Sequence, residues 1–247
     1  MDMNNKYLCI IQARMGSSRL PGKILMKVDG IPMLAYQLRR LARSKKIGRI
    51  VVATSDQVSD DAVEKFCKQA EVDCFRGSEN DVLDRFNRCA DQYPEYDTIV
   101  RITGDCPLVD PQVVDQTIEL YQRTGVDYVS NTDPFLFPDG MDVEVFSRTA
   151  LRVAAESATD PAQREHVTQF IRSNKQFRRG NLTNEQSYSH IRLTLDYPED
   201  FEVIKFIIQH SAPTASYLDY VVLLEQYSEI ATLNIKYIPP ELLKKSN

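Results

Sequence analysis

The stretch YLCIIQA (Tyr7–Ala13), followed by RMGSSRLPGK (Arg14–Lys23), decides the fold of this chain. Its first half is an apolar run of strand length, and its second half is a loop with two glycines, three basic residues and two serines. A second apolar run, RIVVAT (Arg49–Thr54), follows a segment with leucines at helical spacing. Uninterrupted apolar strands are typical of a parallel sheet that is covered on both faces.

Strand-like and helix-like segments alternate from residue 7 to about residue 131. This alternation predicts an α/β fold with a mostly parallel sheet flanked by helices. Ligands of such sheets bind beyond the carboxyl ends of the strands, so the loops after the strands are expected to share one edge. The expected strands are 7–13, 49–54, 72–75, 97–102 and 127–131, and the expected helices are 32–43, 60–69, 81–93 and 111–123.

The alternation becomes irregular over residues 132–190, which carry prolines, glycine and polar stretches. We interpret this segment as an arm inserted into one domain that spans residues 1–247. The elements expected from residue 143 onward are strands at 143–146 and 191–195, helices at 149–157, 161–173, 198–210 and 216–227, and irregular chain at 174–190.

Composition excludes several classes of protein. With 247 residues, 43% hydrophobic and 26% charged, the chain is neither disordered nor fibrous, and its net charge of −5 disfavours nonspecific nucleic-acid binding. No run reaches the ~18 apolar residues of a membrane helix, so membrane insertion is not expected. The opening MDMNNK lacks the order of a secretory signal, and five scattered cysteines without a CxxC pair suit reduced thiols. A cytoplasmic protein is therefore expected.

The loop after the first strand is a candidate phosphate site. It contains Arg14, Arg19 and Lys23 together with Gly16 and Gly22. Glycines let backbone N–H groups approach a phosphate, and the cations offset its charge. The loop matches neither the Walker A pattern nor GxGxxG. The alternative is an ordinary solvated turn with arginines.

Two aspartates follow strands at the same expected edge. Asp105 comes directly after the strand that ends at Ile102, and Asp196 ends the strand 191–195. A carboxylate beside phosphates is repelled unless a cation such as Mg²⁺ bridges them, and magnesium takes one or two carboxylates plus phosphate oxygens. The alternative for Asp105 is that it caps a helix or turn. For Glu199 and Asp200, which lie in the first turn of an expected helix, the helix dipole is a sufficient explanation.

These segments together resemble a known family. QARMGSSRLPGK (12–23), TGDCPLVDP (103–111) and LDYPEDF (195–201) resemble the cytidylyltransferases that activate acidic sugars, the CMP-Kdo and CMP-sialate synthetases. RGSENDVLDRF, FPDGMDVEVF and REHVTQFI point to the branch named for spore-coat polysaccharide biosynthesis protein F. The resemblance runs from about residue 7 to 210 and implies a nucleotide-diphospho-sugar transferase (glycosyltransferase-A-like) architecture.

The resemblance implies an enzyme that transfers CMP from CTP to an acidic sugar, releasing pyrophosphate, for surface polysaccharide synthesis, with Mg²⁺ as cofactor. The implied catalytic residues are Arg19, Lys23, Asp105 and Asp196, the two aspartates being the metal ligands. The implied nucleotide-binding residues are Gln12, Ala13, Arg14, Gly16, Ser17, Arg19, Lys23, Ser78, Asn80, Asp81, Thr103 and Gly104, and the candidate sugar-binding residues are Asp142, Glu144, Arg164, Glu165 and His166. CMP-Kdo synthetases usually have other residues at the positions of Gln12 and Cys106. The resemblance therefore supports CTP as the nucleotide better than it supports a particular sugar as the acceptor.

The arm also suggests an assembly. Phe135, Leu136, Phe137 and Met141 form an apolar cluster that is unlikely to remain in water. In the resembling synthetases this region contributes to a two-fold dimer, so a homodimer with the arm at its interface is expected. The alternative is that the cluster folds back onto its own domain.

Two other functions compete with this interpretation. A glycosyltransferase of the same architecture would bind a nucleotide and a metal, but such enzymes generally use a DxD motif, and Gly104–Pro107 holds one aspartate. A non-catalytic nucleotide- or sugar-binding partner would not need Lys23, Asp105 and Asp196 together. Pyrophosphate release from CTP excludes both alternatives, whereas metal-independent CTP binding without turnover favours the second.

Overall fold

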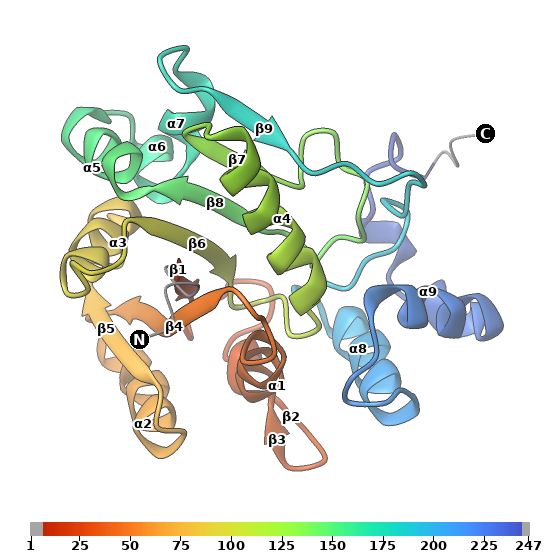
Figure 1. Cartoon of the computed structure of the whole chain (residues 1–247). Coiled ribbons are helices and arrows are strands. Elements are labelled where there is room, and N and C mark those ends of the chain that lie inside the picture. The colour runs from red at the N-terminus through yellow and green to blue at the C-terminus, as the bar shows by residue number, and fades with distance from the viewer. Residues whose placement is uncertain (1–6, 244–247) are drawn as a thin grey trace.

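The computed structural model describes residues 7–243, so the opening residues on which the leader prediction depends lie outside it. A seven-stranded sheet in the order β5-β4-β1-β6-β8-β7-β9 forms its centre (Figure 1). A short antiparallel hairpin, β2 (Lys27–Val28) and β3 (Ile31–Pro32), lies outside this sheet. The strands of the sheet are β1 (Tyr7–Gln12), β4 (Ile47–Ser55), β5 (Asp73–Gly77), β6 (Thr98–Thr103), β7 (Tyr128–Ser130), β8 (Glu144–Ser147) and β9 (Arg179–Asn181).

Helices cover both faces of the sheet, as the apolar strands predict. Along β1, Cys9 and Ile11 pack into one buried cluster, while Leu8 and Ile10 pack into the other, because successive side chains of a strand point to opposite faces. The first cluster includes side chains of α1, α2, α4, α8 and α9, and the second those of α3, α5 and α7. The helices are α1 (Met33–Leu41), α2 (Asp61–Gln69), α3 (Val82–Asp91), α4 (Pro111–Thr124), α5 (Arg148–Ser157), α6 (Pro161–Glu165), α7 (Gln169–Ser173), α8 (Pro198–His210), α9 (Tyr217–Gln226) and α10 (Ser228–Ala231).

The sheet is mostly parallel, which confirms the predicted fold class. β5, β4, β1 and β6 run parallel in that order, so their carboxyl ends share one edge. β8 runs antiparallel to both β6 and β7, and β9 pairs parallel with β7 at the far edge. The loops after β1 and β6 therefore lie side by side, as the sequence predicted.

The segment 132–190 is less of an arm than expected. β8 lies between β6 and β7 in the sheet, and β9 occupies part of the stretch that was expected to be irregular. α5 packs against α3 on the face of the main sheet (Figure 1). The alternating strand–helix pattern did not predict this arrangement. β8 inserts antiparallel between two strands that precede it in the sequence, so the pattern becomes irregular although the chain stays in the same domain.

Two expected elements are not formed as predicted. The helix expected at 161–173 is interrupted at His166–Thr168, where Val167 adopts a left-handed backbone with φ 47°. A β-branched residue avoids this conformation unless surrounding contacts enforce it. The strand expected at 191–195 is reduced to a single bridge between Asp139 and Arg192. The apolar alternation of that stretch instead reflects Leu193 and Leu195, which pack into the main core.

The apolar cluster of the arm divides between core and surface. Phe137 and Met141 are buried in the main core of their own chain, and Phe137 contacts the ring of Tyr217 edge-on at 5.7 Å. Phe135 and Leu136 are half-buried. Most of the burial that this cluster needs is thus supplied within one chain.

Two predictions about the chain as a whole agree with the described part of it. Residues 7–243 include no helix long and apolar enough to cross a membrane. The five cysteines are free thiols, and all of them except the half-buried Cys74 are buried. They serve mainly as small apolar side chains of the core.

Candidate functional site

The carboxyl ends of β1 and β6 form the floor of the site. Gln12 pairs with Thr103 in the strand register, and the Gly104 N–H donates to the Gln12 carbonyl at 2.8 Å. A Cβ atom at Gly104 would lie 2.9 Å from the Cβ of Ala13. Only glycine allows the two loops to approach this closely, so its small size is what brings the basic loop next to Asp105.

The basic loop is anchored by a residue that the sequence interpretation used only as a helix start. Asp60 accepts hydrogen bonds from the Met15 N–H at 2.7 Å and from the Ser55 N–H at 3.0 Å. Burial raises the pKa of Asp60, but the hydrogen bonds from Ser55 and Met15 outweigh it and hold the pKa below its ordinary value. Gly22 closes the loop in a left-handed conformation with φ 71°. An ionised carboxylate thus ties the loop to the end of β4.

Lys23 lies where the two predicted metal ligands meet. Its Nζ donates to Asp105 Oδ2 at 3.0 Å and to Asp196 Oδ1 at 2.9 Å. Burial lowers the pKa of Lys23, but the two carboxylates more than compensate and raise it. Residues separated by 173 positions in the sequence are therefore joined through one buried ammonium group.

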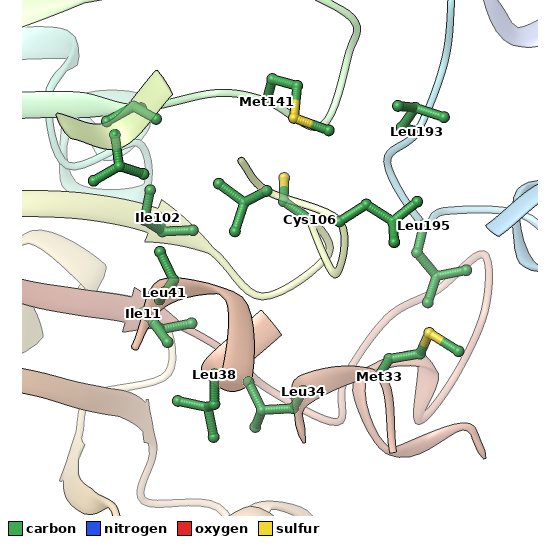
Figure 2. Packing of buried hydrophobic residues seen from close by; sticks show 14 of the residues in the cluster. Ile11, Met33, Leu34, Leu38, Leu41, Ile102, Cys106, Met141, Leu193 and Leu195 are labelled. Carbon is green, nitrogen blue, oxygen red and sulfur yellow. The ribbon is translucent and has the colours of Figure 1, made fainter. Parts of the chain in front are cut away.

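Apolar packing brings the two aspartates together. Cys106 and Leu195, their immediate neighbours in sequence, both belong to the main core and lie close to each other in Figure 2. The Leu195 N–H donates to the Asp105 carbonyl at 2.8 Å. The core thus fixes the backbone at both loops, and the carboxylates project from it toward Lys23.

Asp196 is held by cations on both of its oxygens. Arg19 donates to Oδ1 at 2.7 Å and Arg192 donates to Oδ2 at 3.0 Å. Burial raises the pKa of Asp196, but Lys23, Arg19 and Arg192 outweigh this effect and lower it. The Arg19 side chain is half-exposed and lies over the ring of Tyr197 at 5.2 Å. It is therefore the more accessible of the cations on this carboxylate.

A buried network behind Asp196 was not anticipated from the sequence. Arg192 donates to Asp200 Oδ1 at 3.0 Å and to Asp139 Oδ2 at 2.6 Å, and Asp200 accepts the Asp196 N–H at 2.9 Å. Burial raises the pKa of Asp139 to about 6; Arg192 opposes this, and the neighbouring carboxylates add to it. Asp200, expected only in the first turn of a helix, thus orients Asp196. Asp200 lies four residues after Asp196, and this spacing is the feature of the sequence that could have predicted a contact between the two.

These loops enclose a cleft of about 390 Å³. It unites most of the residues that the sequence and the family resemblance nominated. Glu165 and His166 also reach it, because the chain turns sharply after α6. The lining residues are Gln12, Ala13, Arg14, Gly16, Ser17, Ser18, Arg19, Lys23, Ile24, Thr103, Gly104, Asp105, Glu165, His166 and Asp196.

The segment of Ser78, Asn80 and Asp81 borders this region but does not line the cleft. Arg14 Nη1 lies 3.8 Å from Glu79 Oε1, which links the basic loop to the segment. Asp81 caps α3 by accepting the Asp84 N–H at 2.9 Å.

Arg164 does not line the cleft either. It donates from Nε and Nη2 to the two oxygens of Asp81, at 3.0 and 2.5 Å. Arg164 and Asp81 therefore form an ion pair that joins α6 to the start of α3.

Asp142 and Glu144 line a second, smaller cavity of about 200 Å³. Thr103 lines both cavities, which places the second beside the cleft. Arg101, Thr132 and Arg172 complete its lining. None of these three was nominated from the sequence, since isolated arginines and threonines carry no motif.

The donor set of the cleft fits a hard cation. Asp105 and Asp196 supply carboxylate oxygens, and Asp105 Oδ1 accepts a weak hydrogen bond from the Cys106 thiol at 3.6 Å. Residues 7–243 contain no group of three or more His, Cys, Asp or Glu side chains arranged around a metal. Two carboxylates without a complete protein cage suit Mg²⁺, which keeps waters and shares phosphate oxygens. Lys23 occupies the point between the two carboxylates.

Comparisons with known proteins match the whole of this architecture. A family model described as cytidylyltransferase matches residues 8–236. The chain is 34% identical over 238 residues to spore coat polysaccharide biosynthesis protein SpsF of Bacillus subtilis, covering 92% of this chain and 98% of that protein. It is 35% identical over 119 residues, 46% of each chain, to 8-amino-3,8-dideoxy-manno-octulosonate cytidylyltransferase of Shewanella amazonensis. A solved structure of a cytidylyltransferase from Leptospira borgpetersenii serovar Hardjo-bovis has a TM-score of 0.86 at 35% identity, covering 92% and 97% of the two chains.

Proposed function

The chain belongs to the cytidylyltransferase family, and we propose that it transfers CMP from CTP to an acidic sugar, releasing pyrophosphate, in surface polysaccharide synthesis. The observation that carries this proposal is the meeting of Lys23, Asp105 and Asp196 at one point of a cleft bordered by the basic loop. Cations for a triphosphate and carboxylates for its metal thus lie within contact distance of each other. This is the arrangement that nucleotidyl transfer requires.

The basic loop supplies the binding site for the triphosphate in this proposal. Arg14 and Arg19 are accessible from the cleft, while Lys23 is buried at its floor. The sugar hydroxyl attacks the α-phosphorus, a new P–O bond forms, and the bond to pyrophosphate breaks. Lys23 and Arg19 offset the charge that builds on the leaving group, and Lys23, being buried, acts with little screening.

Asp105 and Asp196 would hold Mg²⁺ in the loaded enzyme. When bound, the ion supplies Lewis-acid stabilisation of the phosphate charge and orients the reacting groups. Arg192 and Asp200 position Asp196 for this role through the contacts described above. Glu165 and His166 line the same cleft and face the acceptor in this proposal.

A nucleotide-by-acceptor matrix with pyrophosphate detection tests the proposal. CTP, UTP, ATP and GTP are each combined with Kdo, N-acetylneuraminate, glucose 1-phosphate or no acceptor, with Mg²⁺ or EDTA. Pyrophosphate is expected with CTP, an acidic sugar and Mg²⁺ together. Equal release without an acceptor, or release with UTP and glucose 1-phosphate instead, would contradict the proposed substrates. Lys27→Ala, at an exposed lysine outside the cleft, serves as the control variant.

A homodimer remains part of the proposal, on narrower grounds than the sequence suggested. Because Phe137 and Met141 pack in their own core, Phe135 and Leu136 are what the arm offers a partner. Two-fold dimers are the commonest assemblies of soluble proteins. Light scattering at micromolar concentration is expected to give twice the chain mass, and Phe135→Ser with Leu136→Ser to reduce it. An active monomer would restrict the arm to its own chain.

A further inference from the structure

The cavity of about 200 Å³ beside the cleft is lined by Glu144, whose two carboxylate oxygens both have partners within the protein. Glu144 Oε1 accepts the hydroxyls of Tyr128 at 2.6 Å and Thr168 at 2.5 Å, and its Oε2 pairs with Arg101. Burial raises the pKa of Glu144, but Arg101 and the two hydroxyls outweigh it and keep the residue ionised. Glu144 was nominated as a sugar ligand; its contacts instead make it the residue that positions Arg101.

Two other polar atoms of the lining residues have no hydrogen-bond partner among the described residues. One is Arg101 Nε, a donor, and the other is Asp142 Oδ1, an acceptor when its proton is absent or on the other oxygen. Both atoms are buried. Buried polar atoms in folded proteins are nearly always paired, and leaving one unpaired costs about 1–3 kcal/mol. One unpaired donor and one unpaired acceptor thus belong to residues that line the same small cavity, where a ligand group could pair with both.

The cavity continues from the cleft toward the acceptor side. Thr103 lines both spaces, and Arg101 Nη2 donates to Gln12 Oε1 at 2.9 Å, with Gln12 lining the cleft. A molecule whose reacting hydroxyl lies near Asp105 can therefore extend past Thr103 into the cavity. This is the position of the far end of an acceptor.

A hydroxyl is the group that suits both open atoms. It accepts from an N–H and donates to a carboxyl oxygen at the same time. An ammonium group has no acceptor lone pair for Arg101. Burial, with Asp139 and Glu144 adding to it, raises the pKa of Asp142 to about 8, so this carboxyl offers little negative charge to an ammonium at neutral pH.

We propose that this cavity selects the acceptor by its uncharged, hydroxyl-bearing end, one hydroxyl accepting from Arg101 Nε and donating to Asp142 Oδ1. The inference rests on the proposed function and deepens it. It assigns the choice of acceptor to Arg101 and Asp142, while the cleft handles the nucleotide. The cavity disfavours an acceptor that carries an amine in place of this hydroxyl.

A matched pair of acceptors tests the inference. Kdo and its 8-amino-8-deoxy counterpart share one skeleton and differ in the terminal group. The readout is the kcat/KM of each acceptor at saturating CTP, with pyrophosphate detection, using the full chain. Kdo is expected to exceed the amine by about tenfold or more, because the amine leaves a buried donor unpaired.

Variants locate the effect. Asp142→Asn keeps an acceptor oxygen and should change the Kdo KM less than about threefold, whereas Asp142→Leu removes it and should raise that KM about tenfold. Arg101→Lys keeps the charge beside Glu144 but loses the Nε donor, and should also raise the KM. Asp133→Leu, at an exposed residue of the same segment, is the control. Thermal unfolding and the KM for CTP verify that each variant is folded and loads the nucleotide.

The outcomes separate the two levels of the proposal. If wild type binds CTP but uses neither sugar acid, the acceptor class and the cavity inference are both overturned. If it uses both equally, or prefers the amine, the cavity inference alone is overturned. The same holds if Asp142→Leu leaves the Kdo KM unchanged.

Discussion

The nucleotide cleft and the acceptor cavity share Thr103 but satisfy their polar groups in opposite ways. In the cleft, Lys23 is held between Asp105 and Asp196, so these three charges are paired before any ligand arrives. In the cavity, buried atoms of Arg101 and Asp142 have no partner among the described residues. In the proposed function the paired charges exchange partners when a triphosphate binds, whereas the unpaired atoms of the cavity suit one uncharged group that both accepts and donates a hydrogen bond. We therefore assign catalysis to the cleft and acceptor choice to the cavity.

The largest effect is expected from the carboxylates of the cleft. Asp105→Asn or Asp196→Asn should lower kcat by at least ~100-fold, because each weakens the hold on the ion that stabilises the transition state. Steady-state pyrophosphate release measures this loss, and EDTA should abolish wild-type activity until Mg²⁺ is restored. Asp133→Asn at an exposed position is the matched control. Full activity in EDTA would show that the reaction does not need a metal ion.

A somewhat smaller effect is expected from the cations. Lys23→Ala should reduce kcat by about 30- to 100-fold with little change in the KM for CTP, since its charge acts mainly on the leaving group. Arg14→Ala should instead raise the KM for CTP by about tenfold. Lys27→Ala should match wild type in both constants. Unaltered kinetics in the Lys23 and Arg14 variants would reduce the loop to an ordinary surface turn.

How far the sequence predicted these two regions differs for a physical reason. The cleft is built from contiguous loops that follow strands, so Arg14, Lys23 and Asp105 were found from strand ends and charge. The cavity gathers Arg101, on a strand, and Asp142, from a loop before β8. Arg101 has no local pattern, and Asp142 was nominated through the family resemblance alone. Their proximity depends on β8 pairing antiparallel beside β6. That pairing is what the alternation of strands and helices did not predict.

The same limit applies to the residues that hold the site together. Asp60 and Asp200 follow ordinary rules for helix starts, which hid their second role of fixing Met15 and Asp196. The break at Val167 was missed because helical periodicity continues across it. The contact between Asp60 and Met15 joins residues 45 positions apart, and local propensity carries no information about such a contact.

A moderate effect is expected where the cleft floor is most crowded. Gly104→Ala places a Cβ 2.9 Å from that of Ala13 and 3.1 Å from the Gln12 carbonyl oxygen, so the two loops must move apart. We expect kcat/KM for CTP to fall about tenfold, since small displacements of catalytic groups slow positioned reactions. Gly180→Ala meets its nearest atom at an ordinary 3.4 Å and should leave the kinetics unchanged. Equal kinetics in both variants would show that the loop spacing does not matter.

The smallest effect concerns stability and pH in the cavity. The pKa of Asp142 is raised from 3.8 to about 8 in the folded chain, so the folded state holds a proton that the unfolded state releases. Its contribution to stability is present below pH ~4 and is lost as the pH rises toward 8. Asp142→Asn removes this dependence, so the variant should gain stability relative to wild type over this range. Denaturant unfolding in EDTA, without ligands, measures the difference; parallel pH profiles would contradict the assignment.

The division between cleft and cavity is tested most directly by comparing Lys23→Ala with Asp142→Leu in one assay, with CTP and Kdo varied independently. We expect Lys23→Ala to lower kcat and to leave the Kdo KM within about threefold of wild type. We expect Asp142→Leu to raise the Kdo KM about tenfold and to leave kcat and the CTP KM unchanged. If Asp142→Leu instead lowers kcat as Lys23→Ala does, or if Lys23→Ala changes only the Kdo KM, the two regions do not have separate roles.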